Sequence, residues 1–305
     1  MTPSSKKPGR RKFVQSLATL PLVGALPLKD MRPATTGQSH SKLKISLNAF
    51  SFNAPLSAGA MTIADMIDFC AETGFLAVDI TAYYFPGYPS VPDDSVLYET
   101  KRRAFSVGLE ISGTGVRNDF TEPDPAKRKE SVQLVKNWIV AAEKLGAPVI
   151  RIFSGLKIPS GFAREQVLEW MIDDINECVS FGRAHGVIVA IQNHNDFIRT
   201  ADDVLEIIKL VPSPWFGLML DIGSYRQGDP YDQIRKTASL AVNWQIKEKI
   251  FVDGKEINVD SDKLISIIKA SGYRGYLPLE TLGDGDPKTK IIALLDKINK
   301  SLLNA

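Results

Sequence analysis

The stretch GVIVAIQNHNDFIRTADDVLEIIKLVPSPWFGLMLDIGS, residues 186–224, combines two β-rich segments with a segment of helical spacing. Residues 187–194 and 216–222 are rich in Val, Ile, Leu and Met and become polar only towards their ends, which favours strands. Between them, residues 200–211 begin at Thr200, a good helix N-cap residue, and continue with the period of an amphipathic helix. The stretch therefore predicts a strand, a helix and a second strand.

The same alternation extends over the rest of the chain from Leu43 onward. The β-rich segments are residues 44–52, 77–85, 109–116, 149–156, 187–194, 216–222, 241–251 and 275–282. The segments of helical period that follow them are residues 62–74, 95–108, 124–146, 164–186, 200–211, 229–239, 261–272 and 286–303. Eight strand–helix pairs without a linker between them predict an α/β protein, a (β/α)8 TIM barrel in a single domain.

An open, doubly wound sheet is the alternative architecture. It predicts a glycine-rich, phosphate-binding turn after the first strand. Residues 50–55, Phe-Ser-Phe-Asn-Ala-Pro, contain no glycine. We therefore expect the closed barrel.

The positive charge of the chain is concentrated at its beginning. The formal net charge is +2, but residues 1–40 contain seven basic residues and one acidic residue, a net charge of +6. The remaining 265 residues therefore carry a net charge of −4. A body without a net positive field does not attract phosphate backbones, so we expect no nucleic-acid partner.

The basic segment has the order of features found in an export signal. The Arg10-Arg11 pair is followed by Phe13 and by a weakly apolar run at residues 17–28. This order resembles a twin-arginine export leader, and the run is too short for a permanent membrane span. We expect residues 1–40 to be an export leader and disordered linker, residues 41–305 to form the barrel, and the protein to be periplasmic or otherwise exported. The alternative is a basic tail with a chance arginine pair.

Four consecutive predicted strands end in side chains that carry oxygen acceptors. These side chains are Gln192, Asp221, Gln245 and Glu280. The active sites of TIM barrels lie at the carboxyl ends of the strands, so we expect the four to converge. Oxygen is the ligand that hard divalent cations prefer. The alternative is that these residues are unrelated structural polar groups that cap helices or bond to strand ends.

The strings that end these strands resemble the xylose-isomerase-like superfamily of sugar isomerases, epimerases and sugar-phosphate isomerases. The resemblance covers the whole body of the chain, and the strings that carry it are AIQNH at 190–194, LDIGS at 220–224, QIKE at 245–248 and LE at 279–280. It implies that Glu, Asp, His and Glu at the strand ends bind a manganese, magnesium, cobalt or zinc ion.

Two of the four implied metal ligands differ in this chain. Asp221 and Glu280 match the family pattern, whereas Gln192 replaces a glutamate and Gln245 replaces a histidine. The ligand set would then carry a charge of −2 rather than the usual −3, with two neutral amides among its members. We expect a divalent metal at Gln192, Asp221, Gln245 and Glu280, bound more weakly than by the usual set.

The first replacement also bears on the reaction. Family epimerases are expected to use two glutamates on opposite sides of the substrate carbon, and Gln192 has no basic form. Glu280 remains as the candidate base. His194 and Lys247 are the other titratable groups near the strand ends, and we expect a nearby metal and partial burial to lower the pKa of Lys247. One base and a polarised carbonyl suffice for enolisation, isomerisation or β-elimination.

The loops after the second and third strands, together with Arg151, are candidates for substrate binding. Tyr83 and Tyr84 offer aromatic faces on which a sugar ring stacks, although they could instead only pack at the mouth of the barrel. Arg117 and Arg151 could hold a phosphate or a carboxylate. Because an exported enzyme meets few sugar phosphates, we expect an unphosphorylated sugar or an oxidised glycoside.

These features lead to one main functional hypothesis and two alternatives. The main hypothesis is an exported sugar isomerase or epimerase that uses a divalent metal and proton transfer next to a carbonyl of an unphosphorylated sugar. The alternatives are a lyase or hydrolase of keto-sugar glycosides and a non-catalytic sugar-binding barrel. The expected partner is a small-molecule carbohydrate. We expect no permanent membrane span in the protein, and a homo-oligomer is compatible with the sequence.

Overall fold

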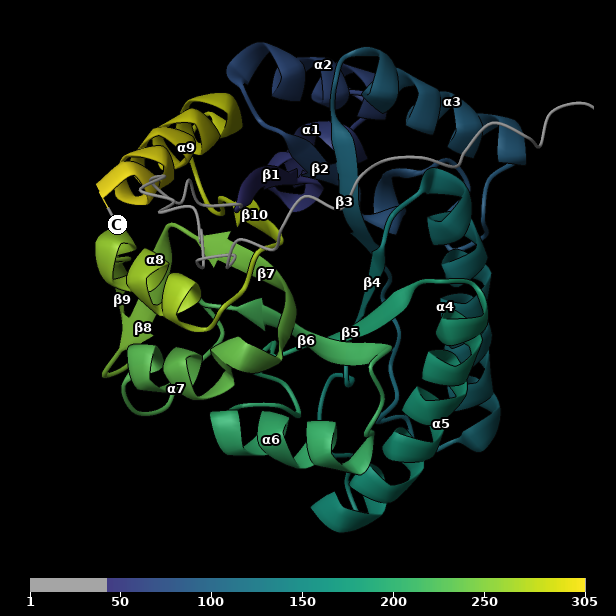
Figure 1. The fold of residues 1–305 in the computed structure, drawn as a ribbon. Helices are drawn as coiled ribbons and strands as arrows, with labels where there is room; N and C mark the ends of the chain where they lie inside the picture. The colour runs from purple at the N-terminus through teal and green to yellow at the C-terminus, as the bar shows by residue number, and fades with distance from the viewer. Residues whose placement is uncertain (1–42, 305) are drawn as a thin grey trace, which may run out of the picture. The chain divides into compact units, whose positions relative to one another are not determined.

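Eight parallel strands close into a barrel in the computed structural model, which describes residues 43–304 (Figure 1). The strands are β1 (Lys44–Asn48), β2 (Ala77–Asp79), β3 (Glu110–Gly115), β4 (Val149–Ile152), β5 (Ile188–Gln192), β6 (Phe216–Asp221), β7 (Ala241–Lys247) and β10 (Tyr276–Glu280). Pairing of β1 with β10 closes the ring. The predicted single-domain (β/α)8 barrel is confirmed, and the predicted export leader lies outside the described residues.

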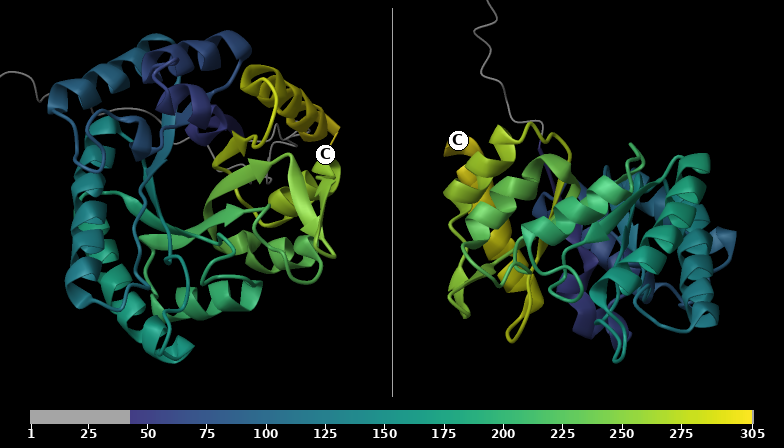
Figure 2. Two further views of the ribbon diagram at one scale, coloured as in Figure 1. Left: turned by 180° about the vertical axis from the view of Figure 1, so that it is seen from behind. Right: turned by 90° about the horizontal axis from the view of Figure 1, so that it is seen from below.

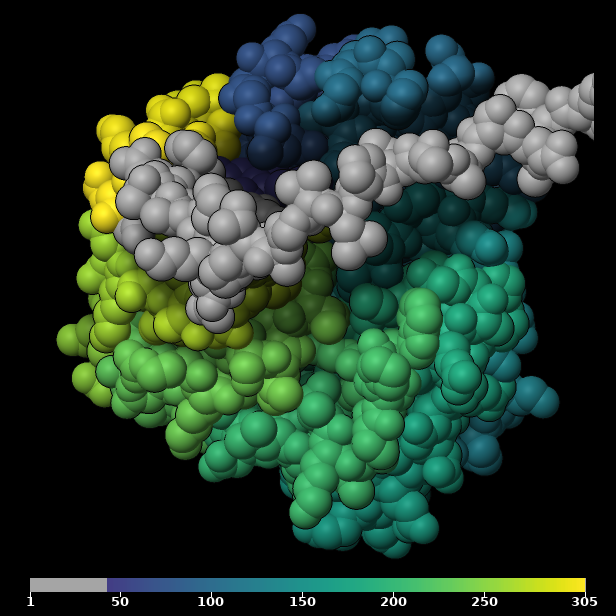
Figure 3. Space-filling model, in the orientation of Figure 1, coloured from purple at the N-terminus to yellow at the C-terminus, as the bar shows by residue number. Residues whose placement is uncertain are grey.

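Helices surround the barrel on its outer side (Figures 1 and 2). They are α1 (Asn53–Ser57), α2 (Ile63–Thr73), α3 (Asp94–Ser106), α4 (Pro125–Leu145), α5 (Arg164–Ala184), α6 (Ala201–Leu210), α7 (Pro230–Thr237), α8 (Ser261–Ala270) and α9 (Pro287–Asn304). Around the perimeter the chain runs in sequence order, from blue through teal and green to yellow (Figure 3). None of the helices within residues 43–304 combines the length and apolar character needed to cross a membrane.

The longer helices begin and end at the capping residues that the sequence contains. Thr62 and Asp65 form a reciprocal capping box at the start of α2, and Asp124 accepts a hydrogen bond from the first turn of α4. Gly74 and Gly146 end these two helices in the left-handed conformation, where a side chain would be strained. Local chemistry therefore sets these boundaries within one or two residues of the predicted ones.

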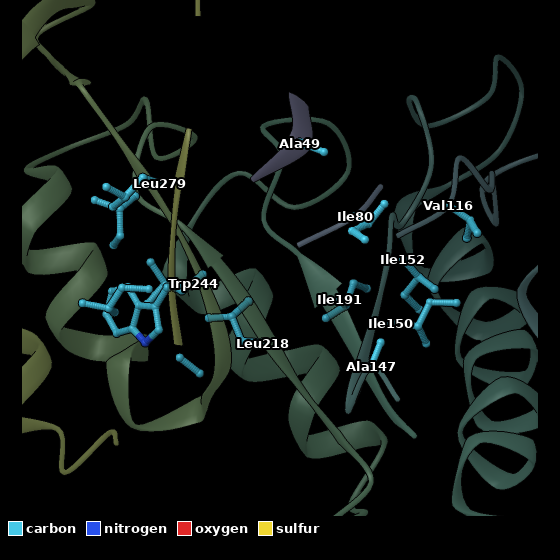
Figure 4. Close-up of a cluster of buried hydrophobic side chains, with 14 of the residues drawn as sticks. Ala49, Ile80, Val116, Ala147, Ile150, Ile152, Ile191, Leu218, Trp244 and Leu279 are labelled. Carbon is cyan, nitrogen blue, oxygen red and sulfur yellow. The ribbon is translucent and has the colours of Figure 1, made fainter. Parts of the chain in front are cut away.

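The main hydrophobic core lies between the strands and the surrounding helices. Ile191, Trp244 and Leu279 are fully buried there (Figure 4). Because successive side chains of a strand point to opposite faces, the next residue along each of these strands points into the barrel. Those next residues are Gln192, Gln245 and Glu280.

A smaller apolar cluster fills the interior of the barrel below the site. It consists of Val149 on β4, Ala190 on β5 and Met219 on β6. The residues two positions further along these strands are Arg151, Gln192 and Asp221. The polar residues thus form the layer at the carboxyl ends of the strands, above an apolar layer.

One part of the predicted alternation is wrong. The segment 241–251, expected as one strand, ends at Lys247 and is followed by an antiparallel hairpin of β8 (Lys249–Val252) and β9 (Lys255–Asn258). Asp253 and Gly254 connect the two hairpin strands with positive φ angles of 49° and 74°, as a two-residue hairpin turn requires. The other predicted strands also end earlier than expected, because the chain leaves the sheet before the β-rich pattern ends.

Candidate active site

A cavity of about 560 Å³ opens at the carboxyl ends of the barrel strands. Seven strands or the loops that follow them contribute side chains to it. The predicted site residues that line it are Tyr83, Arg117, Arg151, Gln192, His194, Gln245, Lys247 and Glu280. Asp221 is fully buried directly behind this lining.

Strand register brings the predicted strand-end residues together. Asp221 of β6 pairs in register with Gln245 of β7, and Lys247 of β7 pairs with Glu280 of β10. The amide nitrogen Nε2 of Gln192 donates to Asp221 Oδ2 over 2.9 Å and to Gln245 Oε1 over 3.0 Å. Four neighbouring strands therefore deliver these side chains to one place.

Asp221 is held by hydrogen bonds from residues that the sequence did not single out. The side chain of Asn193 donates to the carbonyl of Asp221 and accepts from its backbone N–H, both over 2.9 Å. The backbone N–H of Gly223 and the hydroxyl of Ser224 donate to the carboxylate. Burial alone would raise the pKa of Asp221, but the ammonium of Lys247 and these hydrogen bonds hold it below its usual value.

Lys247 places its ammonium between the two acids. Its Nζ lies 2.8 Å from Asp221 Oδ2 and 3.6 Å from Glu280 Oε1, and the side chain is 14% exposed. Burial acts to lower the pKa of Lys247, but the two carboxylates outweigh it and raise the pKa above its usual value. The expectation of a lowered pKa is therefore wrong, and the lysine carries its proton.

Glu280 is buried and only partly paired. The residue is 2% exposed, and its Oε2 has no hydrogen-bond partner among residues 43–304. Burial, which the positive charge of Lys247 offsets in part, raises the pKa of this carboxyl to about 6. A carboxylate with a free oxygen and a pKa close to neutral is suited to accept a proton from a bound molecule.

The basic and aromatic residues form one wall of the cavity. Arg151 donates hydrogen bonds to the hydroxyl of Tyr83 and to the carbonyl of Val116. The guanidinium of Arg117 lies 4.3 Å from the centre of the Tyr83 ring, and that of Arg151 lies 4.0 Å from the Phe153 ring. Within residues 43–304, no carboxylate lies within ion-pairing distance of either arginine, so both can donate to a ligand.

Of the two remaining predicted site residues, Tyr84 lies outside the cavity and His194 lines it. Tyr84 does not line the cavity, and its hydroxyl instead donates to Asn53 Oδ1 over 3.0 Å. His194 does line it and is half exposed, with its ring 4.7 Å from the Phe153 ring and its Nδ1 3.7 Å from Asp196 Oδ2.

A second cavity of about 290 Å³ adjoins the first. The β8–β9 hairpin forms one side of it with Phe251, over whose ring the guanidinium of Arg226 lies at 4.3 Å. His194, Lys247 and Glu280 line both cavities. The titratable groups therefore stand where the two spaces meet.

The sequence as a whole matches the model of a known family. The match to the xylose isomerase-like TIM barrel model covers residues 67–301. The chain belongs to this family. The resemblance inferred from the strand-end strings is thereby confirmed at the level of the family.

Solved structures share the fold at low sequence identity. D-psicose 3-epimerase from Clostridium cellulolyticum H10, crystallised with D-tagatose, is 18% identical with a TM-score of 0.68, covering 85% of this chain and 99% of that chain. The apo 3-keto-D-glucoside 4-epimerase from E. coli is 14% identical with a TM-score of 0.64, covering 85% and 99%. The probable 3-DHS dehydratase from Bacillus anthracis is 16% identical with a TM-score of 0.66, covering 84% and 98%. No curated protein matches the chain.

The family resemblance implies a divalent metal at these strand ends, and the donors of this chain do not fit one. The atom of Gln192 that faces Asp221 is the amide NH₂ group, because an ionised carboxylate only accepts hydrogen bonds. The ammonium of Lys247 lies against the same carboxylate oxygen. Residues 43–304 contain no cluster of three or more His, Cys, Asp or Glu side chains placed to hold a metal ion. The predicted ligands therefore converge without presenting four oxygens to a common centre.

Proposed function

We propose that the protein is a sugar isomerase or epimerase-type enzyme that moves a proton next to a carbonyl of an unphosphorylated sugar. The observation that carries this proposal is the environment of Glu280, a buried carboxylate in the wall of a cavity of about 560 Å³, one oxygen of which has no hydrogen-bond partner among residues 43–304. The membership of the chain in the xylose isomerase-like family supports it.

The roles of the side chains follow from their charges. Glu280 Oε2 accepts the proton from the carbon beside the carbonyl, which leaves an enolate. The protonated Lys247, 3.6 Å from Glu280 Oε1, stabilises the negative charge that develops on the substrate oxygen. The proton of the neighbouring hydroxyl passes to the enolate oxygen, and Glu280 returns its proton to the former carbonyl carbon on the same side of the sugar, so that the carbonyl now lies at the neighbouring carbon. Because Gln192 offers no second base, the site favours isomerisation over a two-base epimerisation.

The arginine and tyrosine wall is suited to hold the sugar. Arg117 and Arg151 line the cavity, have no carboxylate partner among residues 43–304 and can donate to sugar hydroxyl or carbonyl oxygens. Tyr83 and Phe153 add ring surface for the apolar face of a sugar. We assign substrate binding to this wall and leave Tyr84 out of it.

Proton exchange tests the proposed function. The full-length protein is incubated in deuterated water with a set of ketoses and aldoses, and deuterium in the recovered sugar is measured by mass spectrometry and NMR. We expect incorporation with one member of the set and a loss of about 10²–10⁴-fold in Glu280→Gln. Glu110→Gln is the matched control, because Glu110 lies at the opposite end of its strand and is half exposed.

The outcomes separate the hypotheses. Exchange that survives in Glu280→Gln would overturn the role of Glu280. Binding of a sugar by the wild type without any exchange would instead indicate the non-catalytic sugar-binding barrel.

A second candidate function is favoured by the second cavity. A lyase or hydrolase of keto-sugar glycosides needs room for a leaving group next to the base, and the 290 Å³ cavity adjoins Glu280 on the side of the β8–β9 hairpin. His194, which lines both cavities, could then protonate the departing oxygen. Release of the aglycone from a 3-keto-glycoside, followed by NMR, distinguishes this reaction from isomerisation.

We also propose that the protein is exported through a twin-arginine-type leader. The order of Arg10-Arg11, Phe13 and the apolar run supports this proposal.

A further inference from the structure

We propose that the ammonium of Lys247 supplies the positive charge that a bound divalent cation would supply, and that this site binds no divalent cation. The inference deepens the proposed function, on which it rests, because it names the cation that faces the substrate oxygen.

The first argument is the position of the charge. Lys247 Nζ lies 2.8 Å from Asp221 Oδ2 and 3.6 Å from Glu280 Oε1. A divalent metal would need to be about 2.0–2.6 Å from oxygens of the same two carboxylates. An ammonium and a metal ion cannot both lie there, because they would overlap and repel each other. The lysine therefore occupies the space between the acids.

The second argument is the donor set. The amide NH₂ of Gln192 points at Asp221 and at Gln245 Oε1, over 2.9 and 3.0 Å. These N–H groups present positive partial charge towards the space that a metal would share. The oxygen of Gln245 is already an acceptor in this network. The two positions where the family pattern has an acid and a histidine thus bind each other.

The third argument is that the chain makes room for the lysine. A Cβ on Gly223 would lie 2.7 Å from Cδ of Lys247, closer than such contacts occur. The absence of a side chain at Gly223 therefore allows Lys247 to pass over β6 towards Asp221. Strand register fixes Lys247 beside Glu280. The lysine is a built component of the site rather than a surface residue that folds inward.

Metal binding by the wild-type protein is the first test. Full-length protein is dialysed against Mn²⁺, Mg²⁺, Co²⁺ or Zn²⁺ and then against metal-free buffer, and its metal content is measured by plasma mass spectrometry. Calorimetric titration and the melting temperature with and without Mn²⁺ accompany it. We expect far less than one metal ion per chain and no shift in melting temperature. One tightly bound ion per chain at this site would overturn the inference.

Three variants test whether Lys247 holds the position of the cation. The triple variant Gln192→Glu, Gln245→His, Lys247→Met restores the family ligands and removes the ammonium. We expect it to bind one Mn²⁺ per chain and to melt at a higher temperature with Mn²⁺. The double variant that keeps Lys247 should bind Mn²⁺ at least about tenfold more weakly, a difference of about 1.4 kcal/mol. Adding Lys249→Met to that double variant is the matched control, since Lys249 pairs with Glu256 on the hairpin.

Each result has a defined meaning. Equal Mn²⁺ affinity with and without Lys247 would overturn the inference, and so would a triple variant that is folded by circular dichroism but binds no metal. If the triple variant does not fold, the metal content of the wild type still decides.

The substrate is not needed for these measurements, so they can fail independently of the proposed function. With an identified sugar, proton exchange should be unchanged by EDTA. Exchange that EDTA abolishes and Mn²⁺ restores would overturn the inference and leave the proposed function standing. No exchange with any sugar would remove the proposed function without affecting the metal measurements.

Discussion

Asn193 fixes the end of the strand that carries Asp221. Its side chain pairs with both backbone polar groups of Asp221, and the residue is fully buried. Asn118 makes the same two bonds to the backbone of Phe153, the residue that follows β4. Asparagine at a strand end thus ties that end to its neighbour, because one amide supplies both a donor and an acceptor.

Replacing Asn193 should destabilise the protein. Asn193→Leu leaves the N–H of Asp221 buried without its partner, at a cost of about 1–3 kcal/mol, and leaves its C=O with the N–H of Ser224 alone. Urea unfolding should therefore show a loss of about 1–3 kcal/mol together with lower proton exchange. Asn137→Leu, at an exposed position of α4, should change stability by less than about 0.5 kcal/mol. Equal effects of the two substitutions would contradict the role of Asn193.

The raised pKa of Glu280 predicts the pH dependence. Because its pKa is about 6 and the basic form is required, proton exchange should fall about tenfold per pH unit below pH 6 and level off above it. The folded state also holds this proton more tightly than the unfolded chain. The contribution of this group to stability is therefore full at low pH and is lost as the pH rises to about 6.

Two measurements check the predicted pH dependence of proton exchange and of stability. The pH–rate profile of deuterium exchange should show the acid limb. The free energy of unfolding should fall between pH 4 and pH 7 in the wild type relative to Glu280→Gln, because only the wild type loses the contribution of the Glu280 proton. A flat pH–rate profile between pH 5 and 7 would contradict the assignment.

At the residue scale, the sequence predicts which side chains lie at the strand ends but not their protonation states. Period-two alternation placed Gln192, Gln245 and Glu280 on one rim without reference to coordinates. The protonation of Lys247 depends on distances to two acids on other strands, which no local pattern contains. The sequence interpretation therefore placed Lys247 at the strand ends and assigned it the wrong pKa direction.

Helix boundaries follow from caps, and one cap can be tested alone. Thr62 accepts from the N–H of Asp65, whose carboxylate accepts from the N–H and hydroxyl of Thr62. Thr62→Ala should lower the free energy of unfolding by about 1 kcal/mol, measured by urea denaturation. Thr100→Ala is the control, because Thr100 lies inside α3 and alanine is the better helix former there. A larger loss in the control would contradict the capping argument.

The hairpin can be removed without opening the barrel wall. The N–H of Val259 bonds to the carbonyl of Glu248 at its base, and Ile250 is fully buried in the core, so deletion of residues 251–256 with a Gly-Gly turn in their place leaves both intact. If the second cavity holds the leaving group, the deletion should raise KM for a two-ring keto-glycoside by about tenfold or more. Kinetics with a single-ring sugar should not change. Steady-state assays with both substrates check this, with Lys255→Ala at the exposed hairpin tip as control.

The hairpin was also the element that sequence patterns misassigned. Asp253-Gly254 is a strong hairpin-turn signal, but the β-rich residues before it continue directly from β7 and hide the break at Glu248. The remaining strand predictions failed only at their carboxyl ends. There the residues stay apolar or aromatic, as in Phe50 and Phe52, while the backbone has already left the sheet to form a short 3₁₀ helix.

For the whole molecule, the proposed division of the chain makes two predictions. A protein that starts at residue 41 should melt at the same temperature as the full chain, because the barrel has its own core. Residues 1–42 fused to a reporter that matures only after export should direct it across the membrane. Replacement of Arg10-Arg11 by two lysines should reduce export strongly. Unchanged export in that variant, or a lower melting temperature of the shorter protein, would contradict the division.

The alternation of core and site residues along β5, β7 and β10 restricts how this scaffold can acquire a new activity. Moving a functional group by one residue along its strand would turn its side chain outward among the helices. It would also turn Ile191, Trp244 or Leu279 into the cavity at the carboxyl ends of the strands. The pleat therefore fixes the position of each functional side chain along its strand. A new activity on this scaffold would arise from substitutions at these positions and not from moving a functional group along its strand.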